Sequence, residues 1–151
     1  VTEEQFRQKI SEDGFLEYAE VFGHLYGTPK ESVLQRLNAG IDVILEIDVQ
    51  GALQVKKNYP GGVFIFILPP SMRELRRRIQ GRKSETEESV STRLGNALDE
   101  MSHLRSYDYC IVNDSLGEAV ANIAAIITTE HLRVGDRADA LLEKYRNEGD
   151  A

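Results

Sequence analysis

The sequence has a single cysteine, Cys110, and no long hydrophobic run. One cysteine excludes an internal disulfide framework and any metal site made only of cysteines. Its apolar neighbours favour a buried position for Cys110. No segment approaches the run of about 20 apolar residues that a membrane helix needs. The first residues lack the basic and then apolar pattern of a secretory signal. We therefore expect a cytoplasmic protein without a membrane partner.

Positive charge is also scarce, because 18 Lys and Arg face 25 Asp and Glu, for a formal net charge of −7. That balance argues against bulk attraction to nucleic acid, although a local basic patch could still bind phosphate. The 151 residues, 41% of them hydrophobic, suffice for one domain with its own core. The chain begins with Val1 rather than Met, so we expect a fragment or a chain whose front has been removed.

Helix starts are marked by Ser or Thr placed three residues before Glu or Gln, the spacing of a capping box. The pairs are Thr2 and Gln5, Thr28 and Glu31, Ser71 and Glu74, and Ser115 and Glu118. With apolar periodicity, they predict helices over 3–12, 29–39, 50–58, 72–79, 85–104, 116–134 and 136–146.

Short apolar runs predict buried strands at 41–47, 63–68 and 109–112, and we expect residues 15–22 to be extended. Each of the three buried strands is followed by a helical pattern. Alternation of this kind is typical of an α/β fold, with a mostly parallel sheet and helices on both faces.

Two acids, Glu46 and Asp48, stand where the predicted strand 41–47 ends, and Gly51 follows in the next helix. Alternation along a strand points both carboxylates to the same side, and ligands gather beyond the carboxyl ends of parallel strands. These acids could hold a magnesium ion, bind a polar ligand or cap the following helix.

Basic residues are concentrated between positions 73 and 83, and Arg93 follows in the next predicted helix. Arginine matches phosphate oxygens with two parallel donors and stays charged. The alternative is a solvated helix face paired with nearby glutamates, and we favour this alternative for Arg73, Arg76 and Arg77. The cluster comprises Arg73, Arg76, Arg77, Arg78, Arg82 and Lys83.

A third group follows the first predicted helix, where Glu17 alternates with Leu16 and Tyr18 and so faces away from the packing residues. A glutamate on the surface of a strand is usually only solvated. Thr28, at the end of this group, reads as a helix N-cap.

Six phrases in order resemble the guanylate kinases of the bacterial type, over about Phe6 to Arg133. They are FLEYAEVFGHLYGT, ILEIDVQGA, FIFILPPS, RRRIQGR, SETEESVSTRL and YDYCIVND. The resemblance implies a nucleoside monophosphate kinase fold: a P-loop type parallel sheet with flanking helices, part of a GMP-binding subdomain and a helical lid. It places that subdomain at 1–40, the core at 41–81 and 106–151, and the lid at 82–105.

The resemblance also implies roles in binding GMP. Glu17 and Asp48 match the carboxylates that read the N–H donors of guanine. Thr28 matches a hydroxyl residue at the guanine edge, and Tyr26 matches a tyrosine that touches the GMP phosphate. Glu46 stands where many relatives have Asp, and we keep it as a residue of the phosphate or metal region.

For phosphoryl transfer, Arg78, Arg82 and Arg93 match the arginines that clamp the phosphates when the lid closes, and Arg82 also faces ATP. Asn113 matches a position near the adenine of ATP, although it could simply precede the helix at 116. Phosphoryl transfer needs positioning and neutralised charge rather than a covalent intermediate. The implied activity is transfer of a phosphoryl group from ATP to GMP.

The sequence differs from the family pattern in one respect, because the phosphate-binding loop G-x-x-x-x-G-K-[ST] does not occur in these 151 residues. In the family this loop and the first strand lie upstream, and they supply most ligands of the Mg²⁺ that accompanies ATP. We expect no metal site of the chain's own, and little activity from these residues alone. A non-catalytic guanylate-kinase-like interaction domain is the alternative, and a homodimer is left open.

Overall fold

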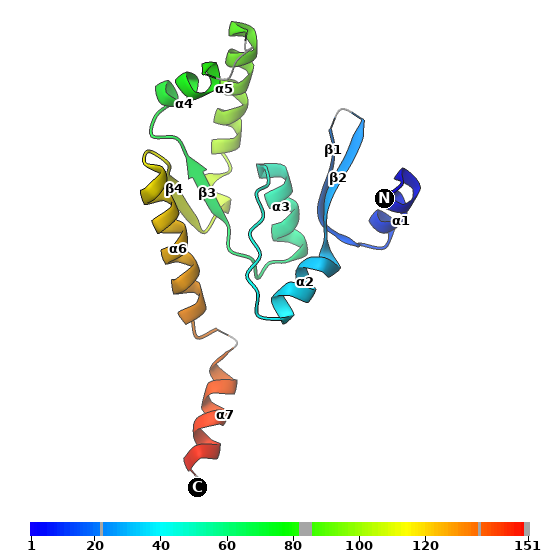
Figure 1. The fold of residues 1–151 in the computed structure, drawn as a ribbon, viewed down its shortest axis with the longest axis vertical. Coiled ribbons are helices and arrows are strands. Elements are labelled where there is room, and N and C mark those ends of the chain that lie inside the picture. Colours follow the sequence, from blue (N-terminus) through cyan, green and yellow to red (C-terminus); the bar gives the residue numbers. More distant parts are fainter. Residues whose placement is uncertain (22, 82–85, 136, 150–151) are drawn as a thin grey trace.

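The computed structural model describes residues 1–21, 23–81, 86–135 and 137–149. Every predicted helix is confirmed to within three residues at each end, but helices and strands do not alternate strictly, because segment 41–47 forms no strand. Figure 1 shows the elements: α1 (Glu3–Ser11), β1 (Phe15–Val21), β2 (His24–Pro29), α2 (Lys30–Asn38), α3 (Val49–Asn58), β3 (Ile65–Leu68), α4 (Met72–Gln80), α5 (Glu87–Met101), the 3-10 turn η1 (Leu104–Ser106), β4 (Tyr109–Val112), α6 (Leu116–Leu132) and α7 (Arg137–Gly149).

Three of the four predicted capping residues act as N-caps. The side chains of Thr2, Ser71 and Ser115 accept hydrogen bonds from backbone amides in the first turns of α1, α4 and α6. The prediction for Thr28 is wrong: Pro29 is the N-cap of α2, without a side-chain hydrogen bond. Thr28 lies in β2, and its hydroxyl is turned to a strand neighbour instead of the helix end.

The predicted three-stranded sheet is only partly formed by the described residues. β3 and β4 pair in parallel, with Ile65 opposite Tyr109 and Leu68 opposite Val112. Segment 41–47 is not a strand, because within the described ranges no other segment pairs with its backbone. An apolar run becomes a β-strand only when a neighbour completes its hydrogen bonds, and Ile44 is 74% exposed.

A hairpin that the sequence did not predict as such joins β1 and β2, with Glu17 opposite Thr28. Gly23, at φ +77°, lies in its turn. The register shifts between Phe15 and Glu17, as in a β-bulge. A bulge changes the alternation of side chains, and Phe15 and Leu16 are both buried as a result.

The core lies where α3 meets β1 and the chain before β3. Its buried members are Leu16, Ala52, Val55 and Phe64, and Leu16 is only 1% exposed. Partly buried side chains from α2, from segment 41–47 and from the chain flanking α3 and β4 complete this cluster: Val33, Leu45, Ile47, Tyr59 and Tyr107. The cluster therefore joins the hairpin to the parallel strands through α3.

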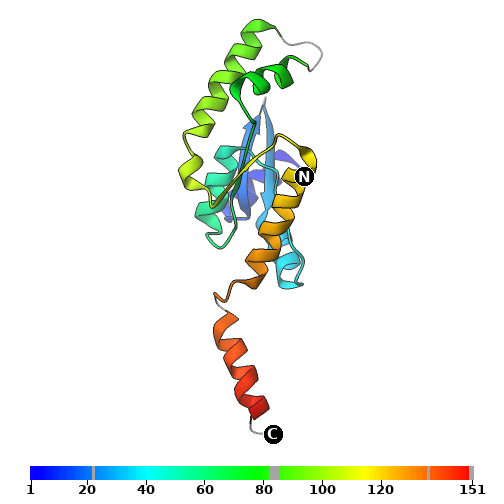
Figure 2. The ribbon, with the colours of Figure 1, turned by 90° about the vertical axis from the view of Figure 1, so that its left-hand side faces the viewer.

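Helices α4, α5 and α6 lie on the side of the parallel strands β3 and β4 (Figure 1). α5 packs against α4, and α6 lies along β4, where the Tyr109 hydroxyl donates to Glu130 at 2.5 Å. In both views α7 extends away from the other elements (Figures 1 and 2). None of the helices in the described ranges is long and apolar enough to cross a bilayer.

One packing prediction is wrong. Cys110 is exposed, because its side chain points to the face of β4 opposite buried Ile111. Leu116 and Val120 of α6 are 73% and 57% exposed, since the face of α6 that packs on β4 centres on Ala119.

Gly27 offers a test of the hairpin geometry. A Cβ at this position would lie 2.9 Å from the Glu17 carbonyl oxygen, 2.9 Å from a Phe15 ring carbon and 3.0 Å from Tyr18 Cβ. We expect Gly27→Ala to lower the free energy of unfolding by about 1–3 kcal/mol, because the surroundings must shift. Urea denaturation measures the change.

The matched control is Gly95→Ala in α5, where an added Cβ meets nothing within 4 Å. Alanine favours a helix interior over glycine by roughly 0.5–1 kcal/mol, so this variant is expected to gain stability. Equal effects of the two substitutions would contradict the tight packing around Gly27.

Candidate functional site

Glu17 and Thr28 form the first part of the site, on the paired strands β1 and β2. The Thr28 hydroxyl donates to Glu17 Oε1 at 2.5 Å, and the contact is partly buried. Glu17 is therefore not a merely solvated surface glutamate. The bond holds one carboxylate oxygen and leaves Oε2 for other partners.

Asp48 forms the second part, at the N-terminus of α3. Its Oδ1 accepts a hydrogen bond from the Gly51 amide at 2.8 Å. Of the three roles that the sequence left open for Asp48, the structure therefore shows that of a helix cap. A Cβ built on Gly51 would lie 3.4 Å from Asp48 Oδ1 and 3.5 Å from Glu17 Oε2. The two carboxylates thus converge at the first turn of α3, where the helix dipole favours negative charge.

Glu46 is exposed, as is Asp48, whereas Leu45 and Ile47 pack against the core. The alternation agrees with the prediction that both acids point to one side. Within the described ranges no group of three or more His, Cys, Asp or Glu side chains is arranged to hold a metal ion.

A hollow of about 210 Å³ lies between the start of α3 and the end of α5. Three of its side chains are acidic, so the hollow suits hydrogen-bond donors better than anions. Its lining residues are Asp48, Val49, Gln50, Asn96, Asp99, Glu100 and His103.

The basic group is centred on Arg78 in α4. Its Nε donates to Glu74 at 2.8 Å, and its Nη1 donates to the carbonyl oxygen of Asn113 at 2.9 Å, just beyond β4. The structure thus brings together two residues predicted to face ATP and its phosphates. Arg93 lies on α5, which packs against α4. Arg82 lies outside the described residues.

Glu74 organises this basic group. Hydrogen bonds from Arg77 and Arg78 lower the pKa of its carboxyl to about 2. Arg77 donates twice to it at 2.7 Å, and Arg76 pairs with Glu87 at 3.1 Å. Arg76 and Arg77 therefore belong to a paired helix face, as predicted.

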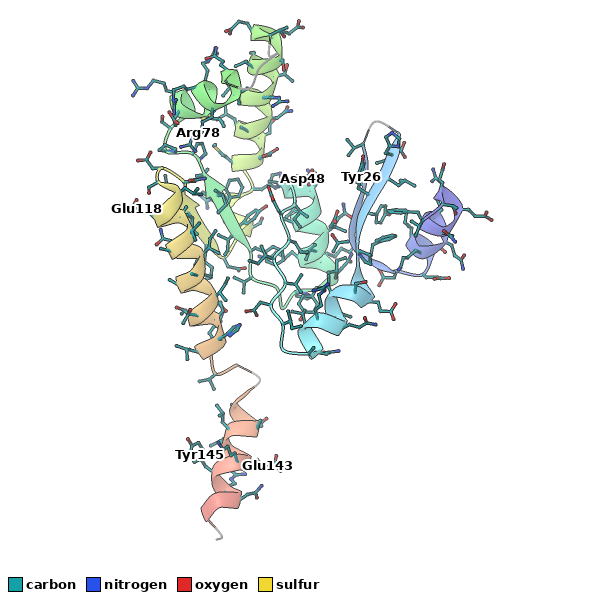
Figure 3. All side chains as sticks on the ribbon, in the orientation of Figure 1. Tyr26, Asp48, Arg78, Glu118, Glu143 and Tyr145 are labelled. Atoms are coloured by element: carbon teal, nitrogen blue, oxygen red, sulfur yellow. The ribbon has the colours of Figure 1, made fainter. Side chains whose placement is uncertain are left out.

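Tyr26 lies on β2 and is 58% exposed. Figure 3 shows Tyr26, Asp48 and Arg78 on three separate elements in the upper half of the view, with Arg78 well apart from Tyr26. The two acids that match guanine-reading residues lie near the first turn of α3, whereas Arg78 belongs to the α4 and β4 side.

Sequence reasoning missed two polar side chains of α3. Gln54 bonds the backbone of Tyr18, and Asn58 bonds that of Leu16. Both are half-buried. Their spacing of four residues, on the face that carries Gly51 and Val55, was a signal for a polar contact on the packed side of the helix.

The depressed pKa of Glu74 predicts a pH dependence of stability. A carboxyl whose folded pKa lies below its ordinary 4.5 stabilises the fold fully above pH 4.5, and this contribution is lost as the pH falls toward about 2. We expect wild type to exceed Glu74→Gln in urea midpoint at pH 6, with the difference shrinking between pH 4.5 and 2.

Glu88→Gln, on the first turn of α5, serves as the control for general acid destabilisation. A difference between wild type and Glu74→Gln that persists unchanged at pH 2 would show that the ion pairs of Glu74 are not its source.

Comparison with known proteins identifies the family. A sequence model of the family described as "Guanylate kinase" matches residues 1–130. The guanylate kinase of Clostridium acetobutylicum is 55% identical over 143 residues, covering 95% of this chain and 68% of the relative. That of Caldanaerobacter subterraneus is 52% identical over 147 residues, covering 97% and 71%.

A solved structure supports the same conclusion. The crystal structure of guanylate kinase from Anaplasma phagocytophilum superposes with a TM-score of 0.70 at 36% identity, over 91% of this chain and 69% of that one. Sequence and fold agree over most of the length, and the chain belongs to the guanylate kinase family.

Proposed function

We propose that the protein transfers a phosphoryl group from ATP to GMP, which yields ADP and GDP. Relatives at 52–55% identity carry the name guanylate kinase. The observation that carries the proposal is the convergence of Glu17 and Asp48 on the first turn of α3, with Thr28 bonded to Glu17.

These acids suit the base of GMP. Guanine presents N–H donors at N1 and N2, and ionised carboxylates are acceptors only. Adenine lacks that pair of donors, so AMP would leave a desolvated carboxylate without its partner. Penalties of this kind can reach on the order of 10⁴-fold in discrimination. Thr28 adds a hydroxyl at the guanine edge and, in the free protein, holds Glu17 in place.

The basic residues serve the phosphates in this proposal. Arg78, Arg82 and Arg93 neutralise charge on the migrating phosphoryl group, since such transfers are catalysed mainly by positioning and electrostatics. Arg82 also binds ATP. Tyr26 donates to the GMP phosphate, and the exposure of its side chain supports that role.

Asn113 and Glu46 complete the nucleotide-binding residues. Asn113 lies near the adenine of ATP in this proposal, and the bond from Arg78 to its carbonyl supports placing both near one nucleotide. Glu46 belongs to the phosphate region, where its exposed side chain is free to reach a metal-bound water. Guanylate kinases are ATP-dependent kinases, and Mg²⁺ enters as the complex with ATP. The described residues gather no metal-ligand cluster, so we assign no step to the ion.

We assign 1–40 to the GMP-binding subdomain, 41–81 and 106–151 to the core, and 82–105 to a lid that closes over the phosphates. Closure would exclude water, which otherwise hydrolyses ATP. The packing of α5 on α4 supports a lid hinged beside the basic group. GMP and ATP are the proposed partners in the cytoplasm, without nucleic acid or membrane.

The names of the relatives favour the enzyme over a non-catalytic guanylate-kinase-like interaction domain. Turnover by the protein in its full natural length decides between the two, measured as ADP formed from ATP with GMP as acceptor. Absence of GMP-dependent ADP formation would refute the proposed function.

Asp48→Asn tests guanine recognition without disturbing the helix. Asparagine caps a helix about as well as aspartate, whereas its amide group presents donors to the donors of guanine. We expect the ratio of kcat/KM for GMP to that for AMP to fall by roughly 10- to 100-fold, as for loss of a charged hydrogen bond. The coupled assay measures both acceptors.

Asp42→Asn, an exposed acid paired with His131, is the matched control and should leave the ratio unchanged. Asp48→Ala should show the same loss of selectivity together with about 1 kcal/mol of lost stability, because the cap is removed as well. Unaltered selectivity in Asp48→Asn would remove Asp48 from the binding site.

A further inference from the structure

β1 is hydrogen-bonded along both of its edges, by β2 on one side and by side chains of α3 on the other. The Tyr18 amide donates to Gln54 Oε1 at 3.2 Å, and Gln54 Nε2 donates to the Tyr18 carbonyl at 3.1 Å. Asn58 Nδ2 donates to the Leu16 carbonyl at 2.9 Å. We call Gln54 and Asn58 the amide clamp.

The amide clamp imitates a neighbouring strand. An edge strand leaves a row of unpaired N–H and C=O groups. A glutamine side chain carries one acceptor and a donor group, the same chemistry as a peptide. By bonding both backbone groups of Tyr18, Gln54 makes the pair of bonds that an antiparallel neighbour would make. Asn58, four residues on, lies on the same face of α3 and adds the next bond along the edge.

The amide clamp grips the residues on either side of Glu17. Leu16 and Tyr18 are its chain neighbours, so fixing their backbone fixes the Cα of Glu17 relative to α3. Asp48 caps the same helix. Helix α3 therefore carries the carboxylate of Asp48 at its N-terminus. Through the side chains of Gln54 and Asn58, the same helix holds the strand that carries Glu17.

Apolar packing alone would not set this spacing. β1 packs against α3 through Leu16, Ala52 and Val55. Hydrophobic contact is non-directional, so this packing tolerates small shifts of β1 along the helix. Hydrogen bonds weaken steeply when their angle or length changes. The amide clamp therefore fixes the position of β1 along α3, which the apolar core does not fix by itself.

We propose that Gln54 and Asn58 are positioning residues that set the separation of Glu17 and Asp48 and thereby the selectivity for guanine. This inference rests on the proposed function. It predicts that the amide clamp acts on GMP and leaves ATP unaffected, because ATP is assigned to the α4 and β4 side of the molecule.

Gln54→Met removes both bonds to Tyr18 and keeps the length of the side chain. In the full-length protein we expect the KM for GMP to rise roughly 3- to 30-fold, the effect of losing one or two neutral hydrogen bonds. The GMP to AMP ratio of kcat/KM should fall, while kcat at saturating GMP and the KM for ATP stay within about twofold. Gln35→Met on α2, whose amide bonds Glu31 of its own helix, is the matched control.

A double-mutant cycle separates positioning from a general structural role. If Gln54 acts through Glu17, then adding Gln54→Met to Glu17→Gln should change the GMP to AMP ratio far less than it does in wild type. Additive effects, equal rises in the KM for GMP and ATP, or an unchanged KM for GMP would each overturn the inference. A wild-type protein without GMP-dependent turnover would instead refute the proposed function.

Discussion

The packing of α3 against β1 and Phe64 is the contact on which the rest of the structure depends. Leu16, Ala52, Val55 and Phe64 form the buried cluster that joins the antiparallel hairpin to the parallel strands. On its other side α3 reaches the chain before β4, where Lys56 Nζ donates to the Ser106 carbonyl at 2.5 Å and lies 4.9 Å from the centre of the Phe64 ring. A short helix thus fixes both small sheets relative to one another.

That arrangement separates two kinds of charge. Carboxylates from β1 and from the α3 cap meet at a helix N-terminus, where backbone amides favour them. Arginines gather on α4, and Glu74 holds two of them in place. Such a division suits a nucleoside monophosphate, which has hydrogen-bond donors on its base and negative charge on its phosphate. The fold places Glu17 and Asp48 at the start of α3, and it places the arginines on the α4 and β4 side.

Sequence and structure disagree where a residue's role depends on a neighbour distant in the chain. Segment 41–47 has the composition of a buried strand, yet the described residues provide no strand to pair with it. Thr28 has the spacing of a helix cap, but pairing of β1 with β2 turns its hydroxyl to Glu17. Cys110 has apolar neighbours, but the register of β4 places it on the exposed side. The sequence pattern records local preference, and strand pairing overrides it.

The sequence by itself determined the helices, because caps and apolar periodicity act within one or two turns. It also determined the family, through six ordered phrases that include Glu17, Asp48 and Arg78. Only the tertiary structure decided which of these residues meet: the bulge that buries Phe15 and Leu16, the approach of Glu17 to Gly51, and the amide clamp on β1. These contacts join residues more than 30 positions apart or depend on strand register, and neither is encoded in local spacing.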